Sequence, residues 1–128
     1  MPRTDEKNPQ HWIRFASADL ELVDMALQNG VASLAVLSKL VEALEKFLKA
    51  FLIHHGWQLK RIHDIEALLQ EASGFDPKLG AYVKIVEPLA EAYFEGRYPG
   101  FDAEDPSLDE LRDVRSQVGP LIEHLKTL

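Results

Sequence analysis

The sequence contains no cysteine, which excludes a disulfide framework, a thiolate nucleophile and a zinc site with cysteine ligands. It also lacks a glycine-rich phosphate loop, a serine-centred nucleophile elbow and a basic helix-turn-helix face. No stretch reaches the roughly 18 consecutive apolar residues that a membrane helix needs. Several classes of enzyme, DNA-binding protein and membrane-anchored protein are therefore not expected.

Positive charge is also scarce, since 14 Lys and Arg stand against 21 Asp and Glu and give a net charge of -7. Affinity for nucleic acid and for anionic membranes depends on Lys and Arg that neutralise phosphates. We therefore expect no strong general nucleic-acid affinity and no membrane binding. The first ten residues are charged and lack the apolar core of a signal peptide, so we expect a cytoplasmic protein.

The composition that remains, 46% hydrophobic and 27% charged over 128 residues, is that of one ordinary folded domain with a sizeable core. Residues 1–8 are polar and are predicted to form a flexible N-terminal tail. Residues 9–128 are predicted to form a single helical domain, because Asn8 is a good helix cap and Pro9 is tolerated at the first helical position.

The segment from about 31 to 54 is predicted to be a long buried helix around which the other segments pack. Its apolar residues surround most of the helix and leave only a narrow polar stripe. Such a helix must be covered on more than one side, by other helices or by a second copy of the chain. The polar stripe consists of Ser38, Glu42, Glu45, Lys46 and Lys49.

Turn and capping residues delimit the other helices. The first is predicted to end at Asn29-Gly30, the third to run from Asp64 to Gly74, the fourth to begin at Asp76-Pro77 and the last at Asp105-Pro106-Ser107, with a loop over 96–105. Pro88 should kink the fourth helix, and Gly119-Pro120 should bend or briefly break the last. The buried face of the first helix is predicted as Trp12, Phe15, Ala16, Leu20, Val23 and Leu27, with Asp19 largely on the other side. The fold class is all-α, an up-and-down bundle of about five helices.

The charged residues of the central helix have two interpretations. In both Glu42-Lys46 and Glu45-Lys49 the glutamate precedes the lysine by four residues, which is the favourable order for an ion pair on a helix surface. Such pairs by themselves account for these charges as a solvent-exposed stripe. Alternatively this face lines a cleft, where the lysines receive phosphates and a nearby carboxylate serves as base or metal ligand.

Two further groups carry the same ambiguity. His63-Asp64 suits an acid-base pair or half of a metal site, but two ligands do not make a metal site and the neighbouring histidines lack metal-binding spacing, so a capping or loop-fixing role is the alternative. Arg97 and Tyr98 can grip a phosphate and stack on a base. Equally, Tyr98 can plug the end of the bundle while Arg97 pairs with a helix carboxylate.

Several short segments, taken in order and spacing, resemble the HEPN domain family, which is named for higher eukaryotes, prokaryotes and nucleotide binding. The resemblance extends from Trp12 to about Leu125. The matching segments are Trp12 with Ala16, Asp19-Leu20 and Ala26; Glu45-Lys46 with Leu48-Lys49-Ala50; His63-Asp64; and Tyr93 with Arg97-Tyr98-Pro99.

The resemblance implies a helical module, often a homodimer, that holds a nucleotide or similar phosphate ligand and works with a partner minimal nucleotidyltransferase in a toxin-antitoxin-like pair. A nucleotide is the only cofactor it implies. Carried over by position, it points to five ligand-binding residues and one outside candidate, Glu45. The five are Lys46, Lys49, His63, Arg97 and Tyr98.

Ribonuclease members of the wider family carry an arginine followed after four to six residues by a histidine in a late helix. Arg97, Arg112 and Arg115 have no histidine at that distance, so no catalytic residue is assigned and a non-catalytic role is favoured. A ribonuclease toxin with an unconventional site and a purely structural interaction protein are the alternatives.

Overall fold

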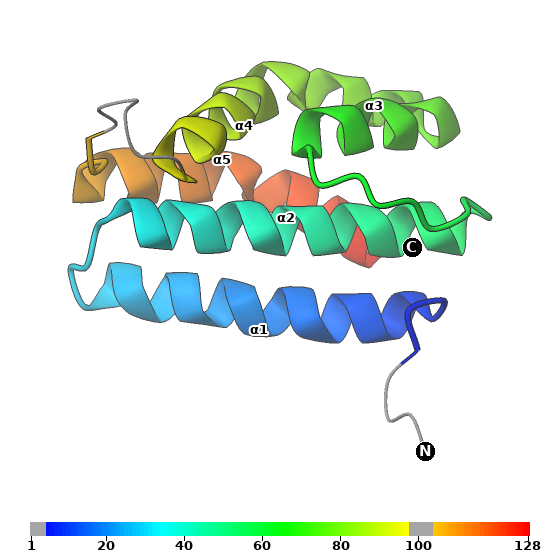
Figure 1. Ribbon diagram of the computed structural model, residues 1–128, viewed down its shortest axis with the longest axis horizontal. Helices are drawn as coiled ribbons and strands as arrows, with labels where there is room; N and C mark the ends of the chain where they lie inside the picture. Colours follow the sequence, from blue (N-terminus) through cyan, green and yellow to red (C-terminus); the bar gives the residue numbers. More distant parts are fainter. Residues whose placement is uncertain (1–4, 98–103) are drawn as a thin grey trace.

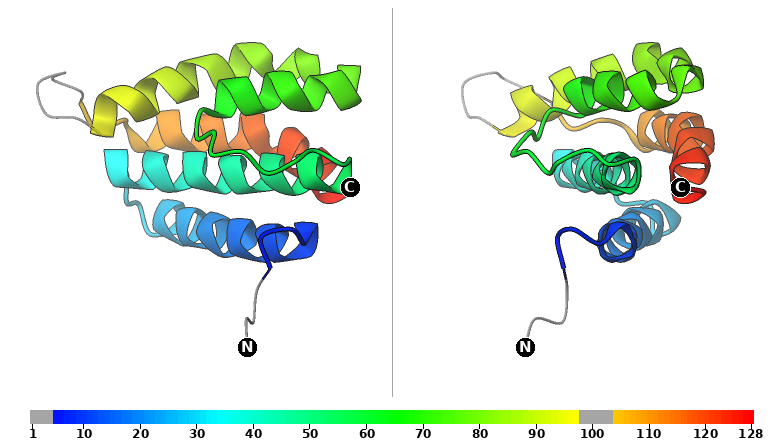
Figure 2. Two further views of the ribbon diagram at one scale, coloured as in Figure 1. Left: turned by 45° about the vertical axis from the view of Figure 1, so that its right-hand side comes forward. Right: turned by 90° about the vertical axis from the view of Figure 1, so that its right-hand side faces the viewer.

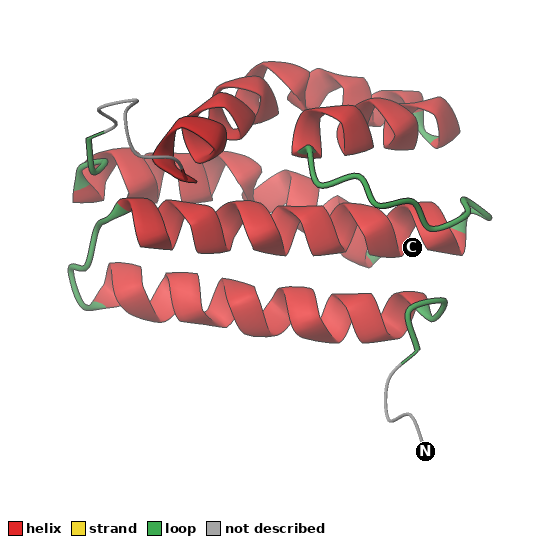
Figure 3. Ribbon diagram, viewed as in Figure 1, coloured by secondary structure: helices red, strands yellow, loops and turns green. Residues whose placement is uncertain are grey.

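The computed structural model describes residues 5–97 and 104–128, and in these ranges the chain is helical without any strand (Figures 1 and 3). The all-α bundle of about five helices is confirmed. The α-helices are α1 (Pro9–Gln28), α2 (Leu34–His54), α3 (Ile65–Phe75), α4 (Val83–Arg97) and α5 (Leu108–Lys126), with a short 3₁₀ helix, η1 (Pro77–Tyr82), before α4.

Most helix ends lie where their capping residues predict. The side chain of Asn8 accepts a hydrogen bond from the Gln10 amide at the start of α1, and Asp64 accepts one from the Glu66 amide at the start of α3. After α1 and α2 the backbone turns at Gly30 and Gly56, whose φ angles of 73° and 90° favour glycine. These local signals account for where α1 and α3 begin and where α1 and α2 end.

Helix α2 is the centre of the bundle, as predicted, although it begins at Leu34. It contacts all four other α-helices: α1 runs antiparallel to it on one side, while α3, α4 and α5 cover the opposite sides (Figures 1 and 2). Its largest fully buried side chains are Leu40, Leu44, Phe47, Leu48 and Leu52. Because it is enclosed in this way, the polar side chains of α2 reach solvent mainly along one narrow stripe, and Lys49 is buried.

The predicted faces of α1 need two corrections. Ala16, Leu20, Val23 and Leu27 are buried as expected, but Phe15 is 42% exposed because it lies about 100° around the helix from Ala16, away from α2. Asp19, predicted on the outer side, instead has its carboxylate toward α2, where it is mostly covered. A neighbouring helix with lysines therefore decides the orientation of Asp19.

Several predicted helix ends are also wrong. Gly74 does not end α3, which continues to Phe75, and the fourth helix begins as η1 before α4 starts at Val83 and continues past Gly96 to Arg97. The predicted break at Gly119-Pro120 is absent from α5. A proline removes one backbone hydrogen bond, and here the buried side chains of Val118 and Leu121 hold the helix on both sides of that position.

Asp76 links the start of η1 to the end of α5. Its carboxylate accepts hydrogen bonds from the Lys78 amide at 3.1 Å and from His124 Nε2 at 2.7 Å. The hydrogen bond from His124 is the main cause that lowers the pKa of Asp76. A carboxyl whose folded pKa lies below its unfolded value, about 3.9, stabilises the fold above that pH, and this contribution is lost as the pH falls through the folded pKa.

We therefore expect Asp76→Asn to lower the thermal unfolding temperature at neutral pH. The difference from the wild type should shrink below about pH 4, as the wild-type carboxyl becomes protonated. Thermal unfolding followed by circular dichroism from neutral to acidic pH measures this, with Asp113→Asn on the exposed side of α5 as the control. A difference that stays constant over the whole pH range would contradict this role of Asp76.

Candidate functional site

Lys49 is the one lysine that α2 buries, with 3% of its surface exposed. Its ammonium group lies 2.8 Å from Glu45 Oε2, one turn earlier, and 5.5 Å from the centre of the Trp12 ring in α1. A buried charge is tolerated when it is paired, and Glu45 supplies that pair. The interpretation of the charged residues as a solvated stripe is therefore wrong for Lys49.

Glu45 also connects this buried lysine to the surface. His63 Nδ1 lies 3.0 Å from the same Oε2 atom, and His63 is 67% exposed whereas Glu45 is 14% exposed. A carboxylate oxygen accepts hydrogen bonds, so the geometry of this contact fits Nδ1 of His63 as the donor. We call this arrangement the Lys49–Glu45–His63 network. It fixes the imidazole and leaves Nε2 on the opposite side of the ring.

Lys46 pairs with Asp19 of α1, while Glu42 pairs with Lys39 at 2.9 Å. The expected Glu42-Lys46 pair is therefore not formed, because α1 places a carboxylate within closer reach of Lys46. The hydrogen bond to Glu42 is the main cause that raises the pKa of Lys39, with Asp19 contributing from 3.9 Å. Each of these two lysines therefore has a carboxylate partner beside it.

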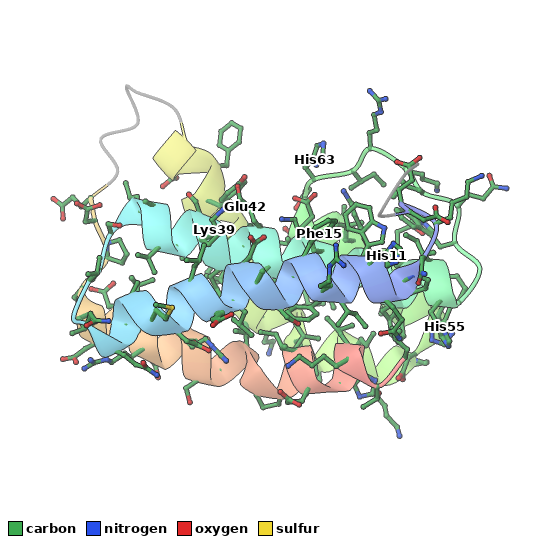
Figure 4. All side chains as sticks on the ribbon, turned by 90° about the horizontal axis from the view of Figure 1, so that it is seen from below. His11, Phe15, Lys39, Glu42, His55 and His63 are labelled. Carbon is green, nitrogen blue, oxygen red and sulfur yellow. The ribbon has the colours of Figure 1, made fainter. Side chains whose placement is uncertain are left out.

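These side chains surround a cleft of about 430 Å³, which we call the α2–α4 cleft. Lys39, Glu42 and His63 lie along one edge of the molecule (Figure 4). The residues that line the α2–α4 cleft are Lys39, Glu42, Glu45, Lys46, His63 and Tyr93. A second hollow of about 440 Å³ shares His63 and Tyr93 and is otherwise lined by Asp64, Glu66, Glu87, Ala90, Glu91 and Phe94. The α2–α4 cleft, which is lined by both lysines and glutamates, therefore adjoins a second hollow whose charged residues are mainly carboxylates.

The structure brings three of the sequence-predicted residues together, since Glu45, Lys46 and His63 all line the α2–α4 cleft. Lys49 lies beneath them, behind Glu45. Arg97 ends α4, and its side chain and Tyr98 lie outside the described residues. The ligand-binding role of all five predicted residues stays a prediction.

Sequence reasoning missed two members of the site. Lys39 lies three residues before Glu42 and seven before Lys46, so extending the polar stripe toward the start of the helix would have found it. Asp19 carried no such signal, because its role depends on the pairing of α1 with α2.

In the described part of the chain no group of three or more His, Asp or Glu is arranged to hold a metal ion. Among those residues there is also no helix with the length and apolar character needed to cross a membrane.

Comparison with known proteins gives one match. The family model of the HEPN domain matches residues 9–128, almost the entire chain. Searches of the curated proteins and of the solved structures each found no significant similarity. The matched range contains all five helices and every residue of the α2–α4 cleft. This chain therefore belongs to the HEPN domain family.

Proposed function

We propose that this protein is a non-catalytic helical module that holds a nucleotide or another phosphate-bearing ligand in the α2–α4 cleft. The observation that carries the proposal is that two lysines and a carboxylate-anchored histidine line one cleft together with a tyrosine. The combination suits a ligand with an anionic end and a flat ring. Amine and imidazole groups bind phosphate, and an aromatic side chain stacks on a base.

The pairing of the lysines with carboxylates leaves room for a ligand. An ammonium group has three donors, and Lys39 and Lys46 each remain partly exposed after their pairs with Glu42 and Asp19 are made. In its imidazolium form, in which both ring nitrogens donate, His63 would add a donor at Nε2, whose direction is set by the contact of Nδ1 with Glu45. A phosphate would compete with Asp19 for Lys46, which favours modest and reversible affinity.

Lys49 would act indirectly in this proposal. It is too deeply buried to bind a ligand without a rearrangement, but it pairs with Glu45, and Glu45 in turn positions His63. Arg97 and Tyr98 stay in the proposal through the family pattern. Tyr93, one turn before Arg97, already lines the cleft.

We further propose that the protein acts in the cytoplasm as a homodimer beside a minimal nucleotidyltransferase, in a toxin-antitoxin-like pair. The support is membership of the HEPN family, in which such pairs and dimers are common. Co-purification with the product of an adjacent transferase gene would test the pairing.

Calorimetric titration with ATP, GTP and inorganic phosphate tests the cleft. We expect at least one nucleotide to bind, and Lys46→Ala or His63→Ala to weaken binding by roughly tenfold, the effect of losing one charge-assisted hydrogen bond. Lys84→Ala, which removes an exposed lysine of α4 outside the cleft, is the matched control. Absence of any nucleotide binding, or an equal loss of affinity in the Lys46 and Lys84 variants, would contradict the proposal.

One contact favours a second candidate, the ribonuclease toxin with an unconventional site. A histidine held by a carboxylate through Nδ1, with Nε2 available as a proton acceptor, is a common arrangement for a general base. Growth arrest on expression that His63→Ala relieves would support this candidate. Harmless expression of the wild type would count against it.

A further inference from the structure

The outer side of α1 is an apolar stripe without a neighbour in the described structure. Helix α1 packs on α2 and, at fewer positions, on α5, and its opposite side faces outward (Figures 1 and 2). Phe15, Leu22 and Met25 lie on that side with 42%, 56% and 52% of their surfaces exposed. Ala18 lies between Phe15 and Leu22 on the same side. In chain order the four residues are separated by three, four and three positions, the spacing of a helix that packs along another helix.

A hollow adjoins the N-terminal half of this stripe. It measures about 180 Å³ and is lined by Asp5, Glu6, His11, Trp12 and Phe15. Figure 4, which looks onto α1 from outside, shows His11 and Phe15 on this half of the helix. The exposed side chains of Leu22 and Met25 lie on the other half. One helix therefore carries a hollow at one end and protruding apolar side chains at the other.

We propose that two copies of this chain pack antiparallel along α1 around a two-fold axis, with Leu22 of each copy seated beside the partner's His11. A two-fold axis makes every such contact occur twice, so a hollow and a protrusion on the same helix complement each other. The same register places Ala18 against the partner's Phe15. The proposal rests on the homodimer proposed above and assigns its surface.

Charge complementarity supports this register independently. Arg14 and Glu21 flank the stripe on one side, and both are exposed. Within the described residues neither forms an ion pair, and Arg14 only lies over the Phe15 ring, 5.3 Å from its centre. With Leu22 on the partner's His11, the heptad geometry sets Arg14 opposite the partner's Glu21, and the two-fold axis repeats this ion pair.

The dimer would leave the ligand site open. No residue that lines the α2–α4 cleft belongs to α1, although Asp19 reaches Lys46 from that helix. Nucleotide binding and dimer formation can therefore be measured separately, and failure of one does not imply failure of the other.

Sedimentation equilibrium tests the surface. We expect the wild type to be a dimer and Leu22→Glu to be a monomer, while Ser116→Glu on the exposed side of α5 stays a dimer. Arg14→Glu and Glu21→Arg should each raise the dimer dissociation constant at least tenfold, because each change opposes two like charges. The variant with both changes should regain most of the affinity, since the exchanged charges pair again across the axis.

The absence of native cysteine permits a direct test of the register. Residues 11 and 22 are roughly 16 Å apart along one helix, too far for an internal disulfide. Oxidation of His11→Cys/Leu22→Cys should therefore yield a covalent dimer on a non-reducing gel, whereas Leu22→Cys paired with Ser116→Cys should not. A monomeric wild type would overturn both the homodimer and this surface. A dimer that survives Leu22→Glu and does not cross-link would overturn the surface alone.

Discussion

Replacing Glu45 by glutamine is expected to lower the free energy of unfolding by about 3 kcal/mol, the low end of what breaking a buried ion pair costs. Glutamine keeps the shape of the side chain and an oxygen that can accept the hydrogen bond from His63. The variant nevertheless leaves the buried ammonium group of Lys49 without a counter-charge, with a neutral amide oxygen and the Trp12 ring as its remaining partners. Urea denaturation measures the change, and an unchanged slope would show that the unfolded state is unaltered.

A second substitution shows whether the cost comes from the unpaired charge. In Glu45→Gln/Lys49→Met the ion pair is replaced by groups of similar size, and stability should return to within about 1 kcal/mol of the wild type. Glu42→Gln is the matched control, because the exposed pair of Glu42 with Lys39 should be worth less than about 1 kcal/mol. If Glu45→Gln costs no more than Glu42→Gln, Lys49 is not held by its carboxylate.

The fold was largely predictable from the sequence because its signals are local. Asn8 caps the first helix in the structure as the sequence predicts, and the last helix is capped by Ser107 of the predicted Asp105-Pro106-Ser107 segment. Gly30 and Gly56 take the positive φ angles that end two helices. Gly74 and Gly119 misled the prediction because glycine permits a helix end without requiring one. At these two positions the structure keeps helical geometry.

The site was less predictable because its partners come from different helices. Spacing alone found the Glu45-Lys49 pair, whose two members are one turn apart. The same rule predicted Glu42-Lys46, but Lys46 instead contacts Asp19, 27 positions earlier in the chain. Periodicity also could not tell that Lys49 lies at the buried edge of the stripe and Lys46 at the open edge. That distinction depends on where α1 and the loop carrying His63 cover α2.

Phe47→Ala is expected to destabilise the protein by about 4 kcal/mol, because a fully buried aromatic side chain at the centre of α2 leaves a cavity that its neighbours fill only in part. Phe94→Ala, which truncates a half-exposed phenylalanine of α4, is the matched control and should cost about 1 kcal/mol or less.

Phe47 directly follows Lys46 on α2, the helix that positions Glu45 and Lys49. Loosening the packing of α2 at Phe47 should therefore also disturb the Lys49–Glu45–His63 network. The His63 ring resonances in NMR spectra of the folded variant should therefore shift, whereas those of Phe94→Ala should shift less unless the neighbouring hollow is altered. Equal stability losses in the two variants would show that α2 is not the enclosed centre on which the site is built.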